Sequence, residues 1–224
     1  LDKFDELYHL YLSLAIYYET KELPNNSANY ILKSIDLINE KGVAFNIEPL
    51  WFKMAKLKYK ALEYDDALDY LEKADESIEN IGDNSFLIQI LRLKAKCQEK
   101  TQLLEDALIT NVRILDLLNE NDLDYANQLN NIGFIYKRLG DDQKAIDYFI
   151  KTLDARESKG YKDEDNVNLL INLGITYQNL KQLKNSKNYL QRAEEAIIKS
   201  DIEKSAQVLD LLALAYLAED HLYN

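Results

Sequence analysis

Residues 129–149 read LNNIGFIYKRLGDDQKAIDYF, and residues 171–190 read INLGITYQNLKQLKNSKNYL. In both stretches an aliphatic residue and a glycine come before a tyrosine, with Gly133 and Tyr136 in the first and Gly174 and Tyr177 in the second. The two glycines are 41 residues apart. Internal repetition at this spacing is typical of a solenoid, in which short structural units stack one on the next.

The same period runs through the whole chain in two series of small residues. The first series is Ala15, Ala55, Ala95, Gly133, Gly174 and Ala213, and the second is Ala28, Ala67, Ala107, Ala145 and Ser186. Neighbouring members of each series are 38 to 41 residues apart. Two series with one period predict a single domain over residues 1–224, with repeats at 8–44, 48–84, 88–123, 126–162 and 167–201 and a partial repeat at 206–224.

Each repeat has two amphipathic halves. Apolar residues recur at three- and four-residue steps in 126–139 and again in 142–158, which predicts two helices. Gly140 lies where the first helix should end, and Asp141 can cap the second. Along the chain this pattern predicts an all-α fold of eleven antiparallel helices, with five pairs and a final helix at 202–218. Each pair buries its apolar stripe against the next pair.

The glycines and prolines agree with a helical fold. Only six Gly and two Pro occur in 224 residues, which favours helix over strand. Most of them fit predicted helix ends or starts: Gly42, Gly82, Gly140, Gly160, Pro24 and Pro49. Gly133 and Gly174 fall inside predicted helices. There the missing side chain lets a neighbouring helix approach closely, at a cost of about 1 kcal/mol in helix propensity.

Composition excludes several classes of protein. The net charge of −12 disfavours binding of nucleic acid by the surface as a whole. No apolar run approaches the roughly 18 residues of a membrane span, and no signal peptide is visible. The single Cys97 cannot form an internal disulfide, and its helical position predicts a small core residue. The chain begins at Leu1 within a helical pattern, as expected of a part of a longer protein.

The sequence contains none of the motifs that carry common catalytic chemistry. A phosphate-binding loop, a GxGxxG stretch, a CxxC pair and an HExxH stretch are all absent. The two histidines, His9 and His221, lie near opposite ends of the chain. Carboxylates are numerous but belong to predicted exposed helix faces. We therefore expect no enzymatic activity, no cofactor and no metal site.

The repeat resembles the tetratricopeptide repeat, whose unit places a bulky residue, Leu-Gly, Tyr, Ala and Phe at fixed offsets. Repeat four meets these offsets with Leu129, Ile132, Gly133, Tyr136, Ala145 and Phe149, and repeat five with Leu170, Leu173, Gly174, Tyr177, Ser186 and Leu190. Lys58 and Gln98 stand where the family has Tyr, which predicts looser layers there. The period exceeds the usual 34 residues and is similar to the longer variant of kinesin light chains and bacterial sensor and regulator proteins. The resemblance implies a right-handed α–α superhelix.

The resemblance also implies that the first helix of each pair lines a concave surface. With the small residue numbered as position eight, positions 2, 5, 6, 9, 12 and 13 share one helix face. In repeats two and three this face offers Phe52, Lys53, Lys56, Tyr59, Lys60, Arg92 and Lys96. In repeats four and five it offers Asn127, Asn130, Asn131, Phe134, Lys137, Arg138, Asn168, Ile171, Asn172, Ile175, Gln178 and Asn179.

Two features of this face point to a peptide ligand. Asn131 and Asn172 hold the same position in adjacent repeats, and an Asn side chain can match both the C=O and the N–H of a peptide backbone. Lys and Arg gather on the face in repeats two to four of an otherwise acidic protein. Such a strip favours an acidic peptide, a C-terminal carboxylate or a phosphorylated segment. Phe52, Tyr59 and Phe134 can serve as apolar anchors between the charges.

The preferred hypothesis is a binding module for a protein or peptide partner, with neither nucleic acid nor membrane bound by this domain. The alternative is a sensory or regulatory input domain of a bacterial histidine kinase or transcription regulator. A third hypothesis is end-to-end self-association through Leu211, Leu214 and Leu217 of the last predicted helix. The sequence leaves both a cytoplasmic and an extracytoplasmic location open.

Overall fold

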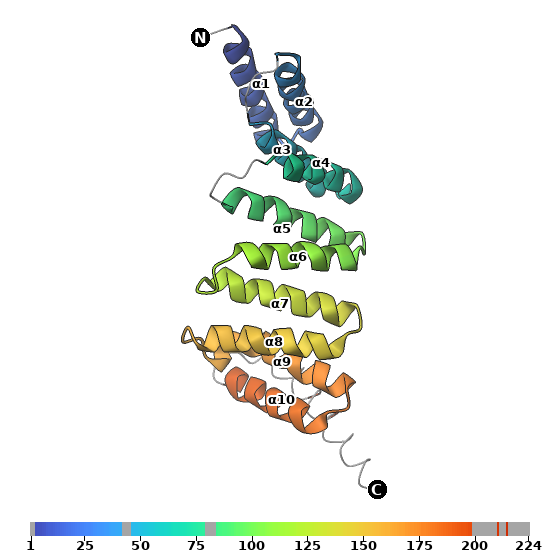
Figure 1. Ribbon diagram of the computed structural model, residues 1–224, viewed down its shortest axis with the longest axis vertical. Coiled ribbons are helices and arrows are strands. Elements are labelled where there is room, and N and C mark those ends of the chain that lie inside the picture. The colour runs from blue at the N-terminus through green and yellow to red at the C-terminus, as the bar shows by residue number, and fades with distance from the viewer. Residues whose placement is uncertain (1–2, 42–45, 79–83, 199–209, 211–213, 215–224) are drawn as a thin grey trace. The chain divides into compact units, whose positions relative to one another are not determined.

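A computed structural model describes residues 3–41, 46–78, 84–198, 210 and 214, and all regular structure in these ranges is helical (Figure 1). The helices are α1 (Lys3–Thr20), α2 (Pro24–Lys41), α3 (Glu48–Lys60), α4 (Tyr64–Ser77), α5 (Ser85–Lys100), α6 (Leu104–Leu117), α7 (Leu123–Arg138), α8 (Asp142–Glu157), α9 (Asp163–Asn179) and α10 (Leu183–Ile198). The predicted all-α fold is confirmed. Ten helices are described where eleven were expected, because the predicted helix 202–218 lies outside the described residues except for Asp210 and Leu214.

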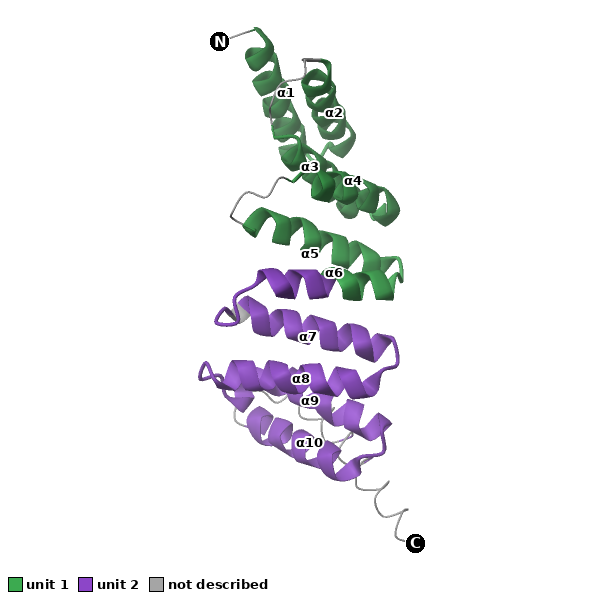
Figure 2. Cartoon of the chain, in the orientation of Figure 1, with its two compact units in different colours: residues 1–110 green, residues 111–224 purple. Residues whose placement is uncertain are grey.

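The chain divides into two compact units, residues 1–110 and 111–224, and the division falls within α6 (Figure 2). In the first unit α1 packs against α2, α3 against α4, and α4 against α5. In the second unit α7 packs against α8, α8 against α9, and α9 against α10. The predicted helices 126–139 and 142–158 correspond to α7 and α8 within three residues at each end.

The helix pairs are joined by turns of one design. A residue in the left-handed conformation follows the first helix in each of the five described pairs: Glu22, Leu62, Gln102, Gly140 and Lys181, with φ between 57° and 80°. In repeat four the N–H of Asp141 then donates to the carbonyl of Tyr136 at 2.9 Å, which satisfies an orphan carbonyl at the helix end. The Asp141 carboxylate accepts from the Lys144 N–H at 3.1 Å, so the predicted cap is confirmed. Gly42 and Gly82 lie outside the described residues.

The two glycines inside helices are sites of close helix contact, as predicted. A Cβ atom on Gly133 would lie 2.7 Å from the ring of Phe149, and one on Gly174 would lie 2.5 Å from Cγ of Leu190. Both partner side chains are fully buried. The paired helices therefore pack at a distance that any side chain at these two positions would disturb.

The second series of small residues needs one correction. In each repeat, the residue five positions after the left-handed turn residue is buried. From repeat one to repeat five these residues are Ser27, Ala67, Ala107, Ala145 and Ser186. In repeat one this residue is Ser27 and not Ala28, which is only half-buried. The hydroxyl of Ser27 donates to the carbonyl of Ala15 at 2.9 Å, so the two small residues of the pair lie against each other. Ala28 was predicted for this buried position because alanine is small and apolar, whereas Ser27 carries a polar hydroxyl.

An aromatic pair joins the two helices in three repeats. Tyr18 stacks on Tyr30, Tyr136 on Tyr148 and Tyr177 on Tyr189, with ring centroids 5.4 to 5.5 Å apart. In each pair the second residue follows the first by twelve positions, which makes the stack a repeated feature of the fold.

The two repeats that lack the first tyrosine have other contacts at these positions. Gln98 accepts a hydrogen bond from Thr110 at 2.8 Å, across the same pair of positions that the tyrosines occupy. Lys58 forms ion pairs with Glu63 and Asp66, the latter at 2.7 Å. The partner position in that repeat, Tyr70, stacks on Trp51 instead. The layers predicted to be looser are therefore held by different contacts.

Equivalent serines should respond oppositely to alanine substitution. The buried hydroxyl of Ser186 has no hydrogen-bond partner among the described residues, so S186A should stabilise the protein by about 1 kcal/mol. S27A removes the bond to Ala15 and should destabilise it by about 1 kcal/mol. Urea unfolding followed by circular dichroism measures both changes. Shifts of the same sign in the two variants would contradict this account of the helix pair.

Candidate functional site

The predicted ligand-facing positions of the second unit lie on α7 and α9. The core-directed positions of these helices, such as Ile132 and Leu173, are buried, whereas Asn131, Asn168 and Asn179 are exposed. Arg138 is also exposed, and Asn130, Ile175 and Gln178 are half-buried. Ile171 is the exception: it is 8% exposed and belongs to the hydrophobic core, so its assignment to the ligand-facing side was wrong. Most of the remaining positions are polar, while Ile175 also packs against the core.

Lys137 and Asn172 are brought together on this surface. The ammonium of Lys137 donates to Oδ1 of Asn172 at 3.4 Å, which joins α7 to α9. Burial lowers the pKa of Lys137, while the more distant carboxylate of Asp142 acts in the opposite direction. Lys137 forms no ion pair with any described residue. A cation that is partly removed from water and has no ion-pair partner is stabilised when an anion binds beside it.

The neighbours of Lys137 on α7 present a mixed surface. Phe134 lies one turn before it and is 36% exposed, with its ring packed edge-on against Phe149 at 5.3 Å. This contact fixes the ring while leaving part of it open to solvent. Asn131 lies a further turn back and is exposed. An apolar ring, an amide and an ammonium are therefore offered along one side of α7.

Arg156 at the end of α8 is a candidate that sequence reasoning missed. Its guanidinium donates to Oδ1 of Asn127 at 2.9 Å and to Oδ1 of Asn166 at 3.3 Å, and so bridges the beginnings of α7 and α9. Its Nε is buried and has no hydrogen-bond partner among the described residues. Two neutral amides hold this cation, and no described carboxylate pairs with it.

A signal in the sequence could have found Arg156. Counted from the turn residues, the equivalent positions in the other repeats are Ile38, Ile78, Leu118 and Ile197. An arginine thus replaces an aliphatic residue in one repeat out of five. The predicted ligand-facing residues all belong to first helices, whereas Arg156 belongs to a second helix, α8, and reaches Asn127 on α7.

The predicted residues of the first unit are more engaged with one another. Phe52 packs edge-on against Phe86 at 5.4 Å, and Tyr59 packs against Tyr64 at 5.5 Å. The ammonium of Lys56 lies 5.8 Å from the centre of the Phe52 ring, and Lys60 pairs with Glu19 at 3.4 Å. Lys53 and Arg92 are half-buried and Lys96 is exposed. The aromatic rings of this unit therefore contribute to its own packing as well as to its surface.

Two kinds of site were looked for across the part of the chain that the structure describes. No group of three or more His, Cys, Asp or Glu side chains is placed to hold a metal ion there. None of the described helices combines the length and the apolarity that crossing a bilayer requires. Cys97 is fully buried, and burial raises the pKa of its thiol to about 11, which fits the predicted core role.

Comparison with known proteins identifies the repeat. Residues 124–199 match the family model for the tetratricopeptide repeat. This stretch, which covers α7 to α10, therefore consists of tetratricopeptide repeats. Comparison with curated proteins found no match. Solenoids of this kind offer extended surfaces for protein and peptide binding.

Solved structures of tetratricopeptide-repeat proteins have the same fold. MamA superposes with a TM-score of 0.66 at 16% identity, over 87% of this chain and 94% of that one. YrrB, described as having an unusual peptide-binding site, gives 0.63 at 16% identity, over 94% and 90% of the two chains. The apo form of RapI gives 0.74 at 17% identity, over 94% of this chain and 59% of that one. At these identities the likeness shows the fold.

Two lysines should respond oppositely to substitution by methionine. K137M removes a charge that burial disfavours and should stabilise the protein by about 1 kcal/mol at neutral pH. Because the pKa of Lys137 is lowered in the folded state, the gain should shrink as pH rises through that pKa and the wild-type lysine also becomes neutral.

K58M is the matched control. Ion pairs with Asp66 and Glu63 raise the pKa of Lys58, so its removal should destabilise the protein by about 0.5–1 kcal/mol. Urea unfolding between neutral and alkaline pH measures both variants. A loss of stability in K137M equal to that in K58M would show that Lys137 is already compensated.

Proposed function

We propose that the surface formed by α7 and α9 binds an extended segment of a partner protein that carries acidic side chains or a carboxylate terminus. The observation that carries this proposal is the half-buried Lys137, whose ammonium is hydrogen-bonded to an amide and forms no ion pair with a described carboxylate. A ligand carboxylate that bonds this ammonium replaces the water it has lost and supplies the missing counter-charge. The proposed role is binding without catalysis.

The asparagines on the same surface suit the backbone of such a ligand. Asn172 uses its carbonyl oxygen toward Lys137, which leaves its amide hydrogens for a peptide carbonyl. Asn131, the equivalent residue on α7, is exposed and can both donate and accept. Amides that pair with a peptide backbone hold an extended segment whatever its side chains, while the cations select for acid. We assign Asn130, Asn168, Gln178 and Asn179 to the polar margin of this surface.

Arg156 extends the proposal to a second acidic group. The guanidinium lies at Asn127, ten residues before Lys137 on the same helix. Ten helical residues span about 15 Å, and an extended peptide covers this distance in about four or five residues. The surface therefore suits a ligand with two acidic groups at that spacing. Lys53, Lys56, Arg92 and Lys96 of the first unit and Arg138 of the second are proposed to add to the attraction for an acidic segment. Lys60 is paired with Glu19 and adds little.

Structural neighbours support binding of a peptide in general terms. YrrB is described as having an unusual peptide-binding site, and a signal-transduction ATPase from Pyrococcus horikoshii is described as having a tetratricopeptide-repeat sensor. The second likeness covers 92% of this chain and 32% of that one, so the repeats there are part of a larger protein. An input domain of a signalling protein is the alternative function, and it would use the same surface.

Fluorescent peptides test the proposal directly. The probe is an octapeptide of Ser and Thr with two glutamates about five residues apart, and the control peptide has lysine at both places. Fluorescence anisotropy should show binding of the acidic peptide alone, with affinity that falls as salt is raised. K137E and the double variant N131A/N172A should each weaken binding about tenfold or more.

N188A is the matched control, because Asn188 is an exposed asparagine on α10 and lies off the proposed surface. It should leave the affinity unchanged, and circular dichroism should show full helicity in every variant. Equal binding of the lysine peptide, or an affinity that is the same at low and high salt, would refute recognition of acidic groups.

A further inference from the structure

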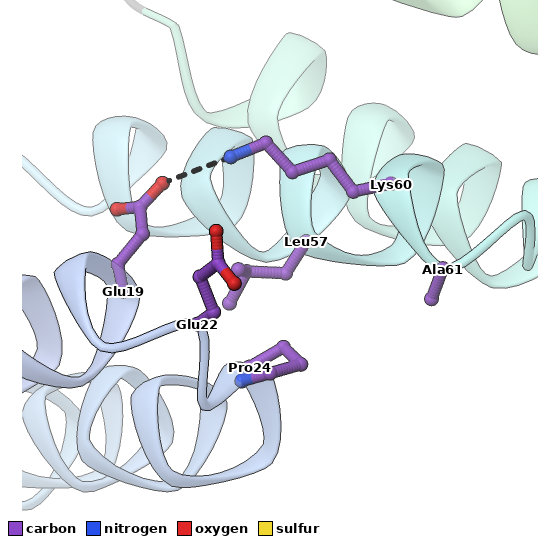
Figure 3. Close-up of a pocket in the computed structure, with 6 residues that line it drawn as sticks. All are labelled: Glu19, Glu22, Pro24, Leu57, Lys60 and Ala61. Carbon is purple, nitrogen blue, oxygen red and sulfur yellow. Dashed lines mark hydrogen bonds and ion pairs between the residues drawn. The ribbon is translucent and has the colours of Figure 1, made fainter.

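A concave feature lies in the first unit, where α2 meets α3. Two adjoining clefts of about 320 and 260 Å³ open there, and Pro24, Leu57 and Ala61 line both of them. Figure 3 shows six residues that line the first cleft, with Pro24 below Leu57 and Ala61 in this view. Each cleft has roughly ten times the volume of one water molecule. We name the two together the α2–α3 cleft.

The cleft is open because small residues stand where another repeat has large ones. Counted from the turn residues, Ala28 is equivalent to Ile146, and Ala61 is equivalent to Leu180. Ile146 is 1% exposed, and Leu180 packs against the core where α8 meets α9. Two alanines in the first unit thus leave unfilled the space that an isoleucine and a leucine fill at the equivalent contact of the second.

The floor of the cleft is apolar and reachable from outside. Met54 and Leu57 of α3 lie at its base, and Leu32 of α2 stays 37% exposed beside them. The residue equivalent to Leu32 is Ile150, which packs against the core of the second unit. Apolar surface left in water costs about 25 cal/mol per Å², so a partner side chain that covers this floor gains free energy.

The rim of the cleft carries an excess of negative charge. Lys60 is paired with Glu19 at 3.4 Å, and Lys58 is paired with Glu63 and Asp66. Both lysines are therefore neutralised by carboxylates, and the pairs hold their long side chains at the edges of the opening. Glu22 also lines the cleft and forms no ion pair with any described residue. Three carboxylates, Glu19, Glu22 and Glu63, line the cleft together with two lysines, and this excess of negative charge favours an approaching cation.

We propose that the α2–α3 cleft binds a segment of a partner protein in which an aliphatic side chain is flanked by basic residues. The aliphatic side chain enters the space left by Ala28 and Ala61, and a neighbouring lysine or arginine meets Glu22. Such a ligand is opposite in charge to the one proposed for the α7–α9 surface. The two sites are on different units and can be tested separately.

Short peptides and nuclear magnetic resonance test this proposal. Ac-Arg-Leu-Arg-NH2 is titrated into the 15N-labelled chain up to about 10 mM, beside Ac-Arg-Ala-Arg-NH2 and Ac-Glu-Leu-Glu-NH2. The first peptide should shift amide signals of Glu22, Leu57 and Ala61. The alanine and glutamate peptides should bind at least about tenfold more weakly. An absence of shifts, or equal shifts with the glutamate peptide, would overturn the proposal.

Variants that fill the cleft give the second arm. A28I and A61L copy the large residues of the other unit and should abolish the shifts while leaving thermal stability equal or higher. E22Q should weaken binding of the arginine peptide without changing the fold. A155L is the matched control, because Ala155 lines a separate cleft of about 500 Å³ in the second unit. Binding that survives A28I and A61L together would place the ligand elsewhere.

Discussion

The close contact between the two helices of a pair is the constraint on which the other features depend. A residue without a side chain on the first helix meets a fully buried Phe149 or Leu190 of the second, with no room for a methyl group. In each pair a residue in the left-handed conformation follows the first helix, at the same place in the repeat. This turn fixes how the second helix is aligned along the first. Because register and separation are fixed together, equivalent positions in different repeats have equivalent surroundings. That equivalence makes a departure in one repeat interpretable.

Polar residues at interior positions show how such departures are resolved. Lys94 stands where other repeats have Met54, Ile132 or Leu173, and it lies 3.8 Å from Glu72 and from the partly buried Asp75. Gln98 is matched by Thr110. In the second unit Arg156 and Lys137 have amides beside them and no paired carboxylate. Lys94 is thus compensated by carboxylates within the chain, whereas Lys137 and Arg156 have only amides as hydrogen-bond partners among the described residues.

The sequence predicted the features that depend on periodicity, since the burial of a helical stripe follows from residue spacing alone. It therefore anticipated the helix pairs, the cap at Asp141 and the close contacts at Gly133 and Gly174.

The sequence-based predictions were wrong or incomplete where three-dimensional contacts decide which residue occupies a buried position or reaches a surface. Ala28 was chosen over Ser27 because a buried hydroxyl is satisfied only by a three-dimensional contact, with Ala15. Ile171 was assigned to the ligand-facing side because helical angle ignores how deep the neighbouring pair reaches. Arg156 needed the same contact information, since its partners lie on two other helices.

The two proposed sites arise from the repeat pattern in opposite ways. At the α7–α9 surface Lys137 and Arg156 are hydrogen-bonded to amides and not to carboxylates, and their desolvation opposes folding in the absence of a ligand. In the α2–α3 cleft side-chain volume is missing, and the lost packing likewise lowers stability. In both places a substitution that restores the pattern of the other repeats is expected to stabilise the chain and weaken binding. A packing fault without a function would show the first effect and not the second, so stability and binding measured on the same variants separate the two explanations.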